Sequence, residues 1–299
     1  MFGIKSKLNI EHITPDLYVT YLVKYIYQNF FLQSRDNHQS LFIIGCQRSG
    51  TSLINRVFAR DLNVRVYRES SRLSSNDPSP IAKNKLRLNS FNEMKATLDK
   101  DKAPIIVFKP LVETQNTLEI LDFFPEAKAL WMYRHYKDVV NSLLKKFSVN
   151  VGIRNLKSIV ENNQENWYSE KVPENIRRVV IQHFSEQMSP YDAAALFWFV
   201  RNQLFYELQL DSNPRALMCR YEDLVTQPDQ VMHCIYEFIG AQYNDKNSWE
   251  VHSNSVKKGH LVQLSPVIEQ LCDDLLRKLE NTYNNQNVLQ RKPVEMLHQ

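Results

Sequence analysis

Short apolar runs recur along the chain, each bounded by polar or turn-forming residues. Continuous apolar runs of this length are typical of strands that are buried on both faces of a parallel sheet. The predicted strands are Leu41–Gly45, Val64–Tyr67, Ile105–Lys109, Ala129–Tyr133 and Ala216–Arg220.

Between these runs, apolar residues recur at the spacing of an amphipathic helix. The predicted helices are Ser52–Arg60, Thr114–Phe123, Tyr136–Phe147, Tyr191–Leu210, Pro228–Ile239 and Ser265–Thr282. Because strands and helices alternate, we predict an α/β fold: a doubly wound, mostly parallel sheet flanked by helices. Ligands bind at the carboxyl ends of the strands in such sheets. The residues that follow predicted strands at that edge are Gly45–Ser52, Lys109, Arg134 and Tyr221.

Three segments interrupt this alternation. The aromatic-rich stretch at about 15–32 has apolar residues at helical spacing. We predict an amphipathic lead helix there that packs on the core, with a membrane-surface role as the alternative. Ser70–Ser90 is rich in Ser, Asn and Pro and is typical of a surface loop. Ser148–Pro190 is polar without a clear strand and is predicted to be a long irregular insertion beside the binding edge. We assign 1–299 to a single domain.

Composition narrows the class of protein. The chain has 299 residues, 43% of them apolar, and a formal net charge of +4. This charge is too small for a nucleic-acid-binding surface, although it allows a local basic pocket for an anion. The four cysteines form no CxxC pair, which argues against a zinc site or a disulfide framework. We find no secretory pattern and no apolar run of about 20 residues that could span a membrane, so we expect a cytoplasmic protein.

The clearest motif is GCQRSGTS, from Gly45 to Ser52. It keeps both glycines and the final hydroxyl of the phosphate-loop template G-x-x-x-x-G-K-[ST], but Thr51 replaces the lysine. A loop that opens a helix in this way presents backbone N–H groups and the positive end of the helix dipole to an anion. Arg48 adds a fixed cation, and the two hydroxyls add donors. The anion site is therefore retained without the lysine.

A second basic motif begins at Arg134, directly after a predicted strand. Ser142 lies eight residues later and Lys146 four residues beyond that, on one face of the next predicted helix. An arginine, a serine and a lysine on one face predict a second phosphate site. Lys109 and Arg134, rather than aspartates, follow the middle strands, so no carboxylate is placed there to hold magnesium. The pattern therefore predicts a ligand that carries several negative charges and no metal.

With these two motifs the chain resembles the sulfotransferases that use 3′-phosphoadenosine 5′-phosphosulfate. Their 5′-phosphosulfate loop looks like GCQRSGTSLINRVF, and their 3′-phosphate motif looks like Arg134 with Ser142. The resemblance is strongest with bacterial and tyrosylprotein sulfotransferases, which share an R-S-G-T-[ST] loop. It runs from about Leu41 to Tyr283, without the segment Ser148–Pro190. It implies a sulfotransferase fold similar to that of the P-loop nucleotide triphosphatases.

The resemblance also implies roles for single residues. Glu69, which follows Arg48 by 21 residues, and Lys109 in VFKP match catalytic positions, with Arg48 assisting. Glu113, four residues after Lys109, is the rival candidate for the catalytic base. The last two donor positions below come from SNSVKKGH, whose spacing differs from the family pattern. The implied donor-binding residues are Arg48, Ser49, Gly50, Thr51, Ser52, Arg134, Ser142, Lys146, Tyr221, Ser255 and Lys258.

The implied activity is transfer of a sulfuryl group from this donor to a hydroxyl, or alternatively an amine, of a small-molecule, carbohydrate or lipid acceptor. No metal is expected, because lysine and arginine take the part that magnesium has in kinases. A bacterial enzyme is favoured, and the sequence does not predict its oligomeric state. Two alternatives are an ATP-dependent small-molecule phosphotransferase of P-loop fold and a non-catalytic nucleotide- or glycan-binding module.

Overall fold

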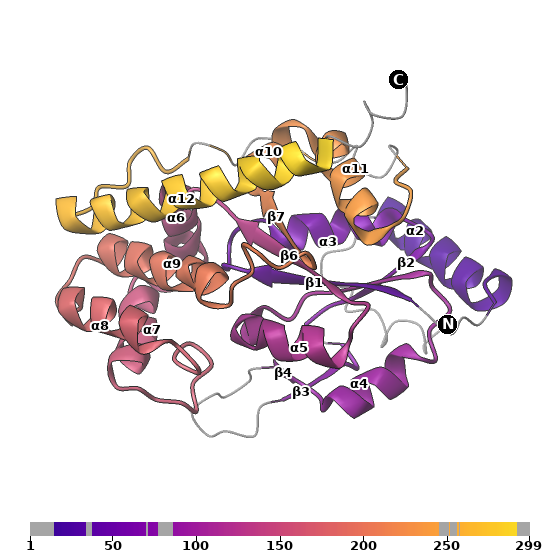
Figure 1. Cartoon of the computed structure of the whole chain (residues 1–299), viewed down its shortest axis with the longest axis horizontal. Helices are drawn as coiled ribbons and strands as arrows, with labels where there is room; N and C mark the ends of the chain where they lie inside the picture. Colours follow the sequence, from indigo (N-terminus) through magenta and orange to yellow (C-terminus); the bar gives the residue numbers. More distant parts are fainter. Residues whose placement is uncertain are drawn as a thin grey trace.

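The central element of the protein is a parallel five-stranded sheet with the strand order β2-β5-β1-β6-β7 (Figure 1). The structure is a computed structural model, and it describes residues 15–33, 38–69, 71–76, 86–244, 251, 256 and 258–291. All five predicted strands are present, with small shifts at their ends. Their bounds are β1 Gln39–Gly45, β2 Val64–Tyr67, β5 Ile105–Phe108, β6 Lys128–Tyr133 and β7 Ala216–Arg220.

The strand order places the end of β1 at the centre of the binding edge. From β1 the chain first builds β2 and β5 on one side and then crosses to build β6 and β7 on the other. In the register, Gly45 lies opposite Met132, so β1 and β6 end within one residue of each other, whereas Phe42 lies opposite Phe108, so β5 ends earlier along β1. The loop after β1 leads to one face of the sheet and the loop after β6 leads to the other, which opens a crevice at this edge. Ligands bind at such a crevice in doubly wound sheets.

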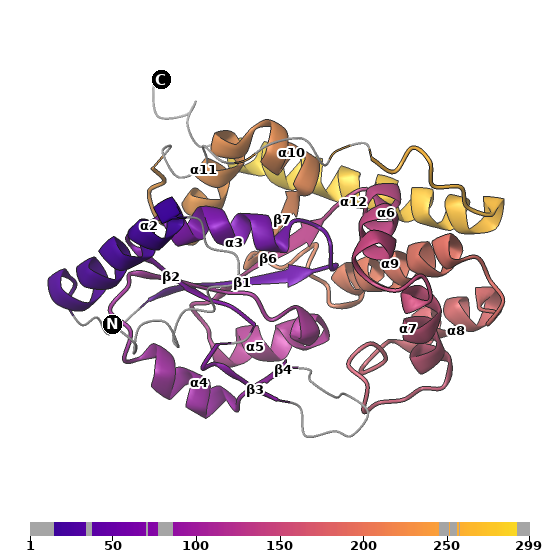
Figure 2. The same ribbon diagram turned by 180° about the vertical axis from the view of Figure 1, so that it is seen from behind.

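Helices cover both faces of the sheet because alternate strand residues point to opposite sides. Leu41 and Ile43 pack in a core with α3 and α11, whereas Phe42 and Ile44 pack in a core on the other face. Figures 1 and 2 show the sheet between these layers. The first face has α3 Thr51–Arg60, α10 Tyr221–Thr226 and α11 Pro228–Ile239. The second core includes residues of α4 Phe91–Leu98, α5 Thr117–Phe123, α6 Tyr136–Lys146, α9 Pro190–Glu207 and α12 Pro266–Arg291.

The two segments predicted to be irregular contain regular structure. The segment Ser148–Pro190 forms two helices, α7 Val151–Val160 and α8 Glu174–His183, so the prediction of a long irregular insertion is wrong. Their apolar residues are spaced for burial against α9, whereas the charged residues Arg154, Lys157, Glu174 and Arg178 are exposed. The loop predicted at Ser70–Ser90 includes a short antiparallel pair, β3 Ser74–Asn76 and β4 Leu86–Leu88.

The lead segment is helical, but its orientation differs from the prediction. It consists of α2 Pro15–Ile26 and a π-helical turn, η1 Tyr27–Phe31. The pattern predicted that the apolar positions pack on the core, yet Leu22 and Ile26 are exposed, whereas Lys24 and Gln28 are buried. Specific hydrogen bonds from the polar side chains decide the orientation here. None of the described helices is long and apolar enough to cross a membrane.

Candidate active site

The loop after β1 has a backbone that its two glycines make possible. Gly45 has φ = 114°, and a Cβ there would lie 2.4 Å from the carbonyl oxygen of Met132 on the neighbouring strand. Gly50 has φ = 87°, and a Cβ there would lie 2.3 Å from the ring of Tyr221. Arg48 also has a positive φ, of 67°, which is uncommon for a residue with a side chain. The loop therefore bends tightly between β6 and the Tyr221 ring.

The helix that follows this loop begins without any local anionic partner. Gly50 is the N-cap of α3, no side chain caps the helix, and its first turn contains no acidic residue. The N-terminal N–H groups of a helix carry a partial positive charge and attract anions. Ser49 and Thr51 are buried in the loop, whereas Ser52 faces solvent. The start of α3 is thus suited to bind a phosphate or sulfate group.

The second basic motif contacts this loop directly. Arg48 Nε donates a hydrogen bond to Ser142 Oγ at 3.0 Å. Arg134, which is only 6% exposed, donates from its guanidinium to the carbonyl oxygen of Arg48 at 3.5 Å. The Arg134 guanidinium also lies 4.2 Å from the centre of the Tyr221 ring, in a cation–π contact. The two motifs, far apart in the sequence, therefore form one cationic site.

The cations in this site are crowded. Burial, followed by the charge of Arg134, lowers the pKa of the Arg48 guanidinium. The carboxylate that pairs with Arg134 is Asp138, at 3.4 Å and one helical turn later. A bound anion would reduce the repulsion between the two guanidinium groups. Lys146 is exposed one turn beyond Ser142.

Asp138 also attaches a C-terminal segment to the site. The backbone N–H of Gly259 donates to Asp138 Oδ1 at 2.7 Å. The side-chain amide of Asn141 donates to the carbonyl oxygen of Lys258 at 2.8 Å. Lys258 therefore lies against α6, close to the second motif, and its side chain is exposed. Ser255 lies outside the described residues.

A pair of opposite charges lies at the other end of the site, beside β5 and β2. Lys109, the first residue after β5, has its Nζ 3.4 Å from Glu69 Oε1 and donates to Ser52 Oγ at 3.4 Å. The Lys109 side chain is 12% exposed and that of Glu69 is 36% exposed. Both contacts are long for a hydrogen bond, so these groups can rearrange toward a ligand. Among the described residues, no cluster of His, Cys, Asp and Glu is arranged to hold a metal ion.

Glu113, the rival of Glu69, is fully engaged in structural contacts. Its carboxylate accepts two hydrogen bonds from Arg87, at 2.6 and 3.1 Å, and one from Asn116 at 2.7 Å. It also accepts the backbone N–H of Leu88 at 3.1 Å. Glu113 is 4% exposed and lies in the 3₁₀ helix η2 Leu111–Asn116, where it attaches β4 to the main body.

Two supporting residues were not identified from the sequence as site components. Trp198 donates from Nε1 to the carbonyl oxygen of Arg134 at 3.0 Å. Arg201, one turn further along α9, is 1% exposed and donates to the carbonyl oxygen of Leu111 at 3.4 Å. Burial lowers the pKa of Arg201 to about 10. These contacts fix the backbone on both sides of the site. The sequence signal that could have identified Arg201 is its charge within an otherwise apolar helix.

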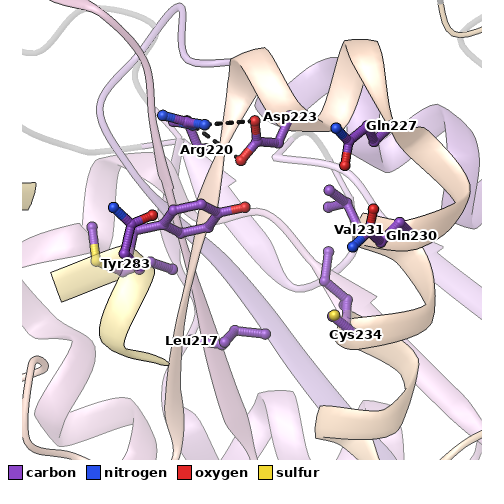
Figure 3. Close-up of a pocket in the computed structure, with 11 residues that line it drawn as sticks. Leu217, Arg220, Asp223, Gln227, Gln230, Val231, Cys234 and Tyr283 are labelled. Carbon is purple, nitrogen blue, oxygen red and sulfur yellow. Dashed lines mark hydrogen bonds and ion pairs between the residues drawn. The ribbon is translucent and has the colours of Figure 1, made fainter. Parts of the chain in front are cut away.

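A separate cavity lies beside the edge strand β7, between α11 and α12 (Figure 3). It has a volume of about 400 Å³, and its lining includes Arg220, Asp223, Cys234 and Tyr283. Arg220 is already paired with Asp223, at 2.8 Å, as the dashed lines in Figure 3 show. None of the predicted donor-binding or catalytic residues lines this cavity.

Comparisons with known proteins show the family and agree with the fold. A family model of the sulfotransferase domain matches residues 38–270, so the chain belongs to this family of transferases. The chain is similar in structure to the sulfotransferase domain from the curacin biosynthetic pathway, with 15% identity and a TM-score of 0.54, covering 82% of this chain and 99% of that one. It is also similar to the sulfotransferase domain of the Synechococcus PCC 7002 olefin synthase, with 14% identity and a TM-score of 0.51, covering 83% and 98%. A search of curated protein sequences found no significant match.

Proposed function

We propose that the protein transfers a sulfuryl group from 3′-phosphoadenosine 5′-phosphosulfate to a hydroxyl, or alternatively an amine, of a small-molecule, carbohydrate or lipid acceptor. The observation that carries this proposal is the direct contact between the two anion-binding motifs, from Arg48 Nε to Ser142 Oγ. A donor with phosphate groups on both its 5′ and 3′ oxygens needs two such sites within reach of one another. A ligand with a single phosphate chain needs only the first.

The donor-binding residues divide between the two motifs. We assign the 5′-phosphosulfate to the N-terminus of α3, with Arg48, Ser49, Gly50, Thr51 and Ser52. We assign the 3′-phosphate to Arg134, Ser142 and Lys146, with Tyr221, Ser255 and Lys258 placed around the nucleotide. The crowding of Arg48 against Arg134 supports this fit, since burial and the neighbouring like charge lower the pKa of Arg48 and a bound anion would offset both effects.

The transfer chemistry is assigned to the charge pair beside β5. The donor, when bound, supplies an activated sulfuryl group on its 5′-phosphate. Glu69 acts as the general base that takes the proton from the acceptor hydroxyl. Lys109 and Arg48 stabilise the negative charge that develops on the departing phosphate oxygen. The position of Lys109 between Ser52 and Glu69 supports this role, because it links the donor loop to the base.

The choice of Glu69 over Glu113 rests on their hydrogen bonds. A general base needs a lone pair that can reach the acceptor proton. The Glu113 carboxylate accepts hydrogen bonds from Arg87, Leu88 and Asn116. If Glu113 moved toward an acceptor, these donors would lose their partner. Glu69 is partly exposed and makes one long ion pair.

Calorimetric titration of the purified protein with adenosine 3′,5′-bisphosphate, AMP and ATP, each with and without magnesium, tests the donor assignment. We expect the bisphosphate to bind most tightly and magnesium to have no effect on its affinity. Magnesium-dependent binding of ATP that exceeds binding of the bisphosphate would instead indicate a phosphotransferase. Assays with radiolabelled 3′-phosphoadenosine 5′-phosphosulfate and a panel of hydroxyl and amine acceptors then test for transfer, and binding without transfer to any acceptor would favour a non-catalytic module.

A further inference from the structure

The lead segment is attached to the rest of the protein by polar side chains. Lys24 Nζ donates to the carbonyl oxygen of Ala59 at 2.9 Å and reaches that of Phe58 at 3.4 Å. Gln28 Nε2 donates to the carbonyl oxygens of Leu62 and Val64, at 2.8 and 3.0 Å. These carbonyls belong to the last turn of α3, to the turn after it and to the first residue of β2. The inward face of the segment is therefore its polar face.

The apolar side chains of the same segment point away from the protein. Val19, Leu22, Val23 and Ile26 recur at helical spacing, so they lie on one side of α2. We call these four residues, together with the exposed aromatic residues of α2 and η1, the outer face. Their exposed fractions range from 38% to 78%. The outer face consists of Val19, Leu22, Val23, Tyr25, Ile26, Phe30 and Phe31.

The outer face reaches the upper limit of the apolar patch on an ordinary monomer. A fully buried aromatic side chain hides 150–250 Å² and an aliphatic one less, so these three aromatic and four aliphatic side chains, at their exposed fractions, present roughly 600 Å² of mainly apolar surface. The largest apolar patch of a typical monomer is roughly 300–600 Å². A standard protein–protein interface buries about 800 Å² on each partner. The outer face therefore supplies most of the apolar area that one side of a stable interface needs.

The polar anchors prevent the segment from turning its apolar side inward. Lys24 meets carbonyls at the C-terminal end of α3, where the helix dipole also favours a cation. Rotation of α2 would leave these carbonyls and the Gln28 partners without their donors. Burial lowers the pKa of Lys24 to about 7, so the inward arrangement itself has an energetic cost. Coverage of the outer face by another surface would offset both the exposed apolar area and this cost.

We propose that the outer face binds the outer face of a second copy of this chain, forming a dimer with twofold symmetry. In such an interface each residue near the axis faces its own copy, so a charge there would meet a like charge. No side chain of the outer face is charged, which makes the surface compatible with itself. A helix held rigidly by Lys24 and Gln28 is also ordered before it binds, which reduces the entropy lost on association.

The location of the segment favours a second copy over a membrane. The lead segment contacts the end of α3 through Lys24 of α2 and the start of β2 through Gln28 of η1, at the end of the sheet opposite to Arg48 and Lys109. Figure 1 shows α2 at one end of the molecule and α7, α8 and α9 at the other. A bilayer on the outer face would lie far from the site that handles the acceptor, whereas a dimer formed there leaves both sites open.

Sedimentation velocity of the full chain over a wide concentration range tests this proposal. We expect a dimer, and we expect the double variant Val23→Glu/Phe30→Glu to raise the dimer dissociation constant by about a hundredfold or more, because like charges would face each other. Val267→Glu, which changes a 58%-exposed valine at the start of α12, is the matched control and should remain dimeric. The far-ultraviolet circular dichroism spectrum and binding of adenosine 3′,5′-bisphosphate check that each variant is folded. Neither measurement depends on whether the proposed transfer activity is found.

Charge complementation distinguishes self-association from loss of folding. Val23→Glu and Val23→Lys chains should each dissociate more readily than the wild type, and a mixture of the two should form a heterodimer detectable by native mass spectrometry. A wild-type chain that stays monomeric at all concentrations would overturn the proposal. If that monomer also co-sediments with phosphatidylcholine vesicles and the double variant does not, the outer face is a membrane-binding surface instead.

Discussion

The two halves of the site differ in how firmly the fold holds them. On the side of β6, Arg134 and Asp138 are buried, and Arg134 contacts Tyr221, Arg48 and Asp138 at once. On the side of β5, Lys109 and Glu69 make long contacts and retain exposure, up to 36% for Glu69. We call the side of β6 the recognition half and the side of β5 the transfer half.

The difference shows which part of the proposed reaction the fold arranges in advance. A buried guanidinium is tolerated only when packing and hydrogen bonds compensate for its lost hydration, so the recognition half is also part of the protein core. The transfer half needs to exchange its contacts as donor and acceptor bind, and groups with weak contacts can do so without breaking the core. Changes in the recognition half should therefore affect binding and stability together, and changes in the transfer half should affect turnover alone.

The largest effect is expected from the proposed base. Glu69→Gln keeps the size of the side chain and removes its basicity, so turnover should fall by about 10²–10⁴. Affinity for adenosine 3′,5′-bisphosphate and the melting temperature should stay near wild-type values. Steady-state kinetics with the labelled donor and calorimetric binding measure the two quantities separately.

Glu113→Gln is the matched control for that variant. It should destabilise the protein by about 2 kcal/mol, because the change removes a partly buried ion pair with Arg87, and chemical denaturation would measure this loss. Its turnover per folded molecule should remain close to wild type. Loss of turnover in Glu113→Gln with full activity in Glu69→Gln would move the base to Glu113.

The second-largest effect concerns the packing of the loop against Tyr221. Gly50→Ala places a Cβ within 2.3 Å of the Tyr221 ring at φ = 87°, so overpacking adds to backbone strain, and we expect about 3 kcal/mol of lost stability. Gly240→Ala, at φ = 75° with no atom within 4 Å of the new Cβ, should cost about 1 kcal/mol. Equal losses in urea denaturation would mean that Tyr221 moves aside easily and that the recognition half is less rigid than the contacts indicate.

Arg134→Ala should weaken binding of adenosine 3′,5′-bisphosphate by about 1.5–3 kcal/mol, the scale of a charge-assisted hydrogen bond to a phosphate. The loss should be much smaller for AMP, which has no 3′-phosphate. If both ligands lose the same affinity, Arg134 acts on the loop through the Arg48 carbonyl and does not contact the 3′-phosphate.

The smallest effect is expected at the exposed edge of the recognition half. Lys146 is exposed, so Lys146→Ala should weaken bisphosphate binding by about 0.5 kcal/mol, and most of that loss should disappear at high salt. A loss as large as that of Arg134→Ala would show that Lys146 becomes buried when the ligand binds.

Much of the fold followed from local patterns. All five strands and most of the large helices were predicted, because a strand buried on both faces must be continuously apolar and a helix that packs on a sheet must have an apolar stripe. The helices α7 and α8 were missed because they lie in a segment rich in polar residues. Their apolar positions become recognisable only once α9 is present as the surface that buries them.

The sequence by itself determined the chemistry of the site: a phosphate loop without its lysine, followed by an arginine and a serine eight residues apart. Tertiary structure decided which groups are available to act. Glu69 and Glu113 are both glutamates, and the sequence alone does not show which of them is available as a base. The structure distinguishes them, because hydrogen-bond donors from β4 and η2 surround the Glu113 carboxylate. The lead helix shows the same dependence on tertiary structure. Its pattern predicts that the apolar face packs inward, but Lys24 and Gln28 donate to carbonyl oxygens on α3 and the adjoining turn, so the apolar face is exposed. A sequence pattern records what each residue can do, whereas hydrogen bonds between distant segments depend on which partners the whole fold brings within reach.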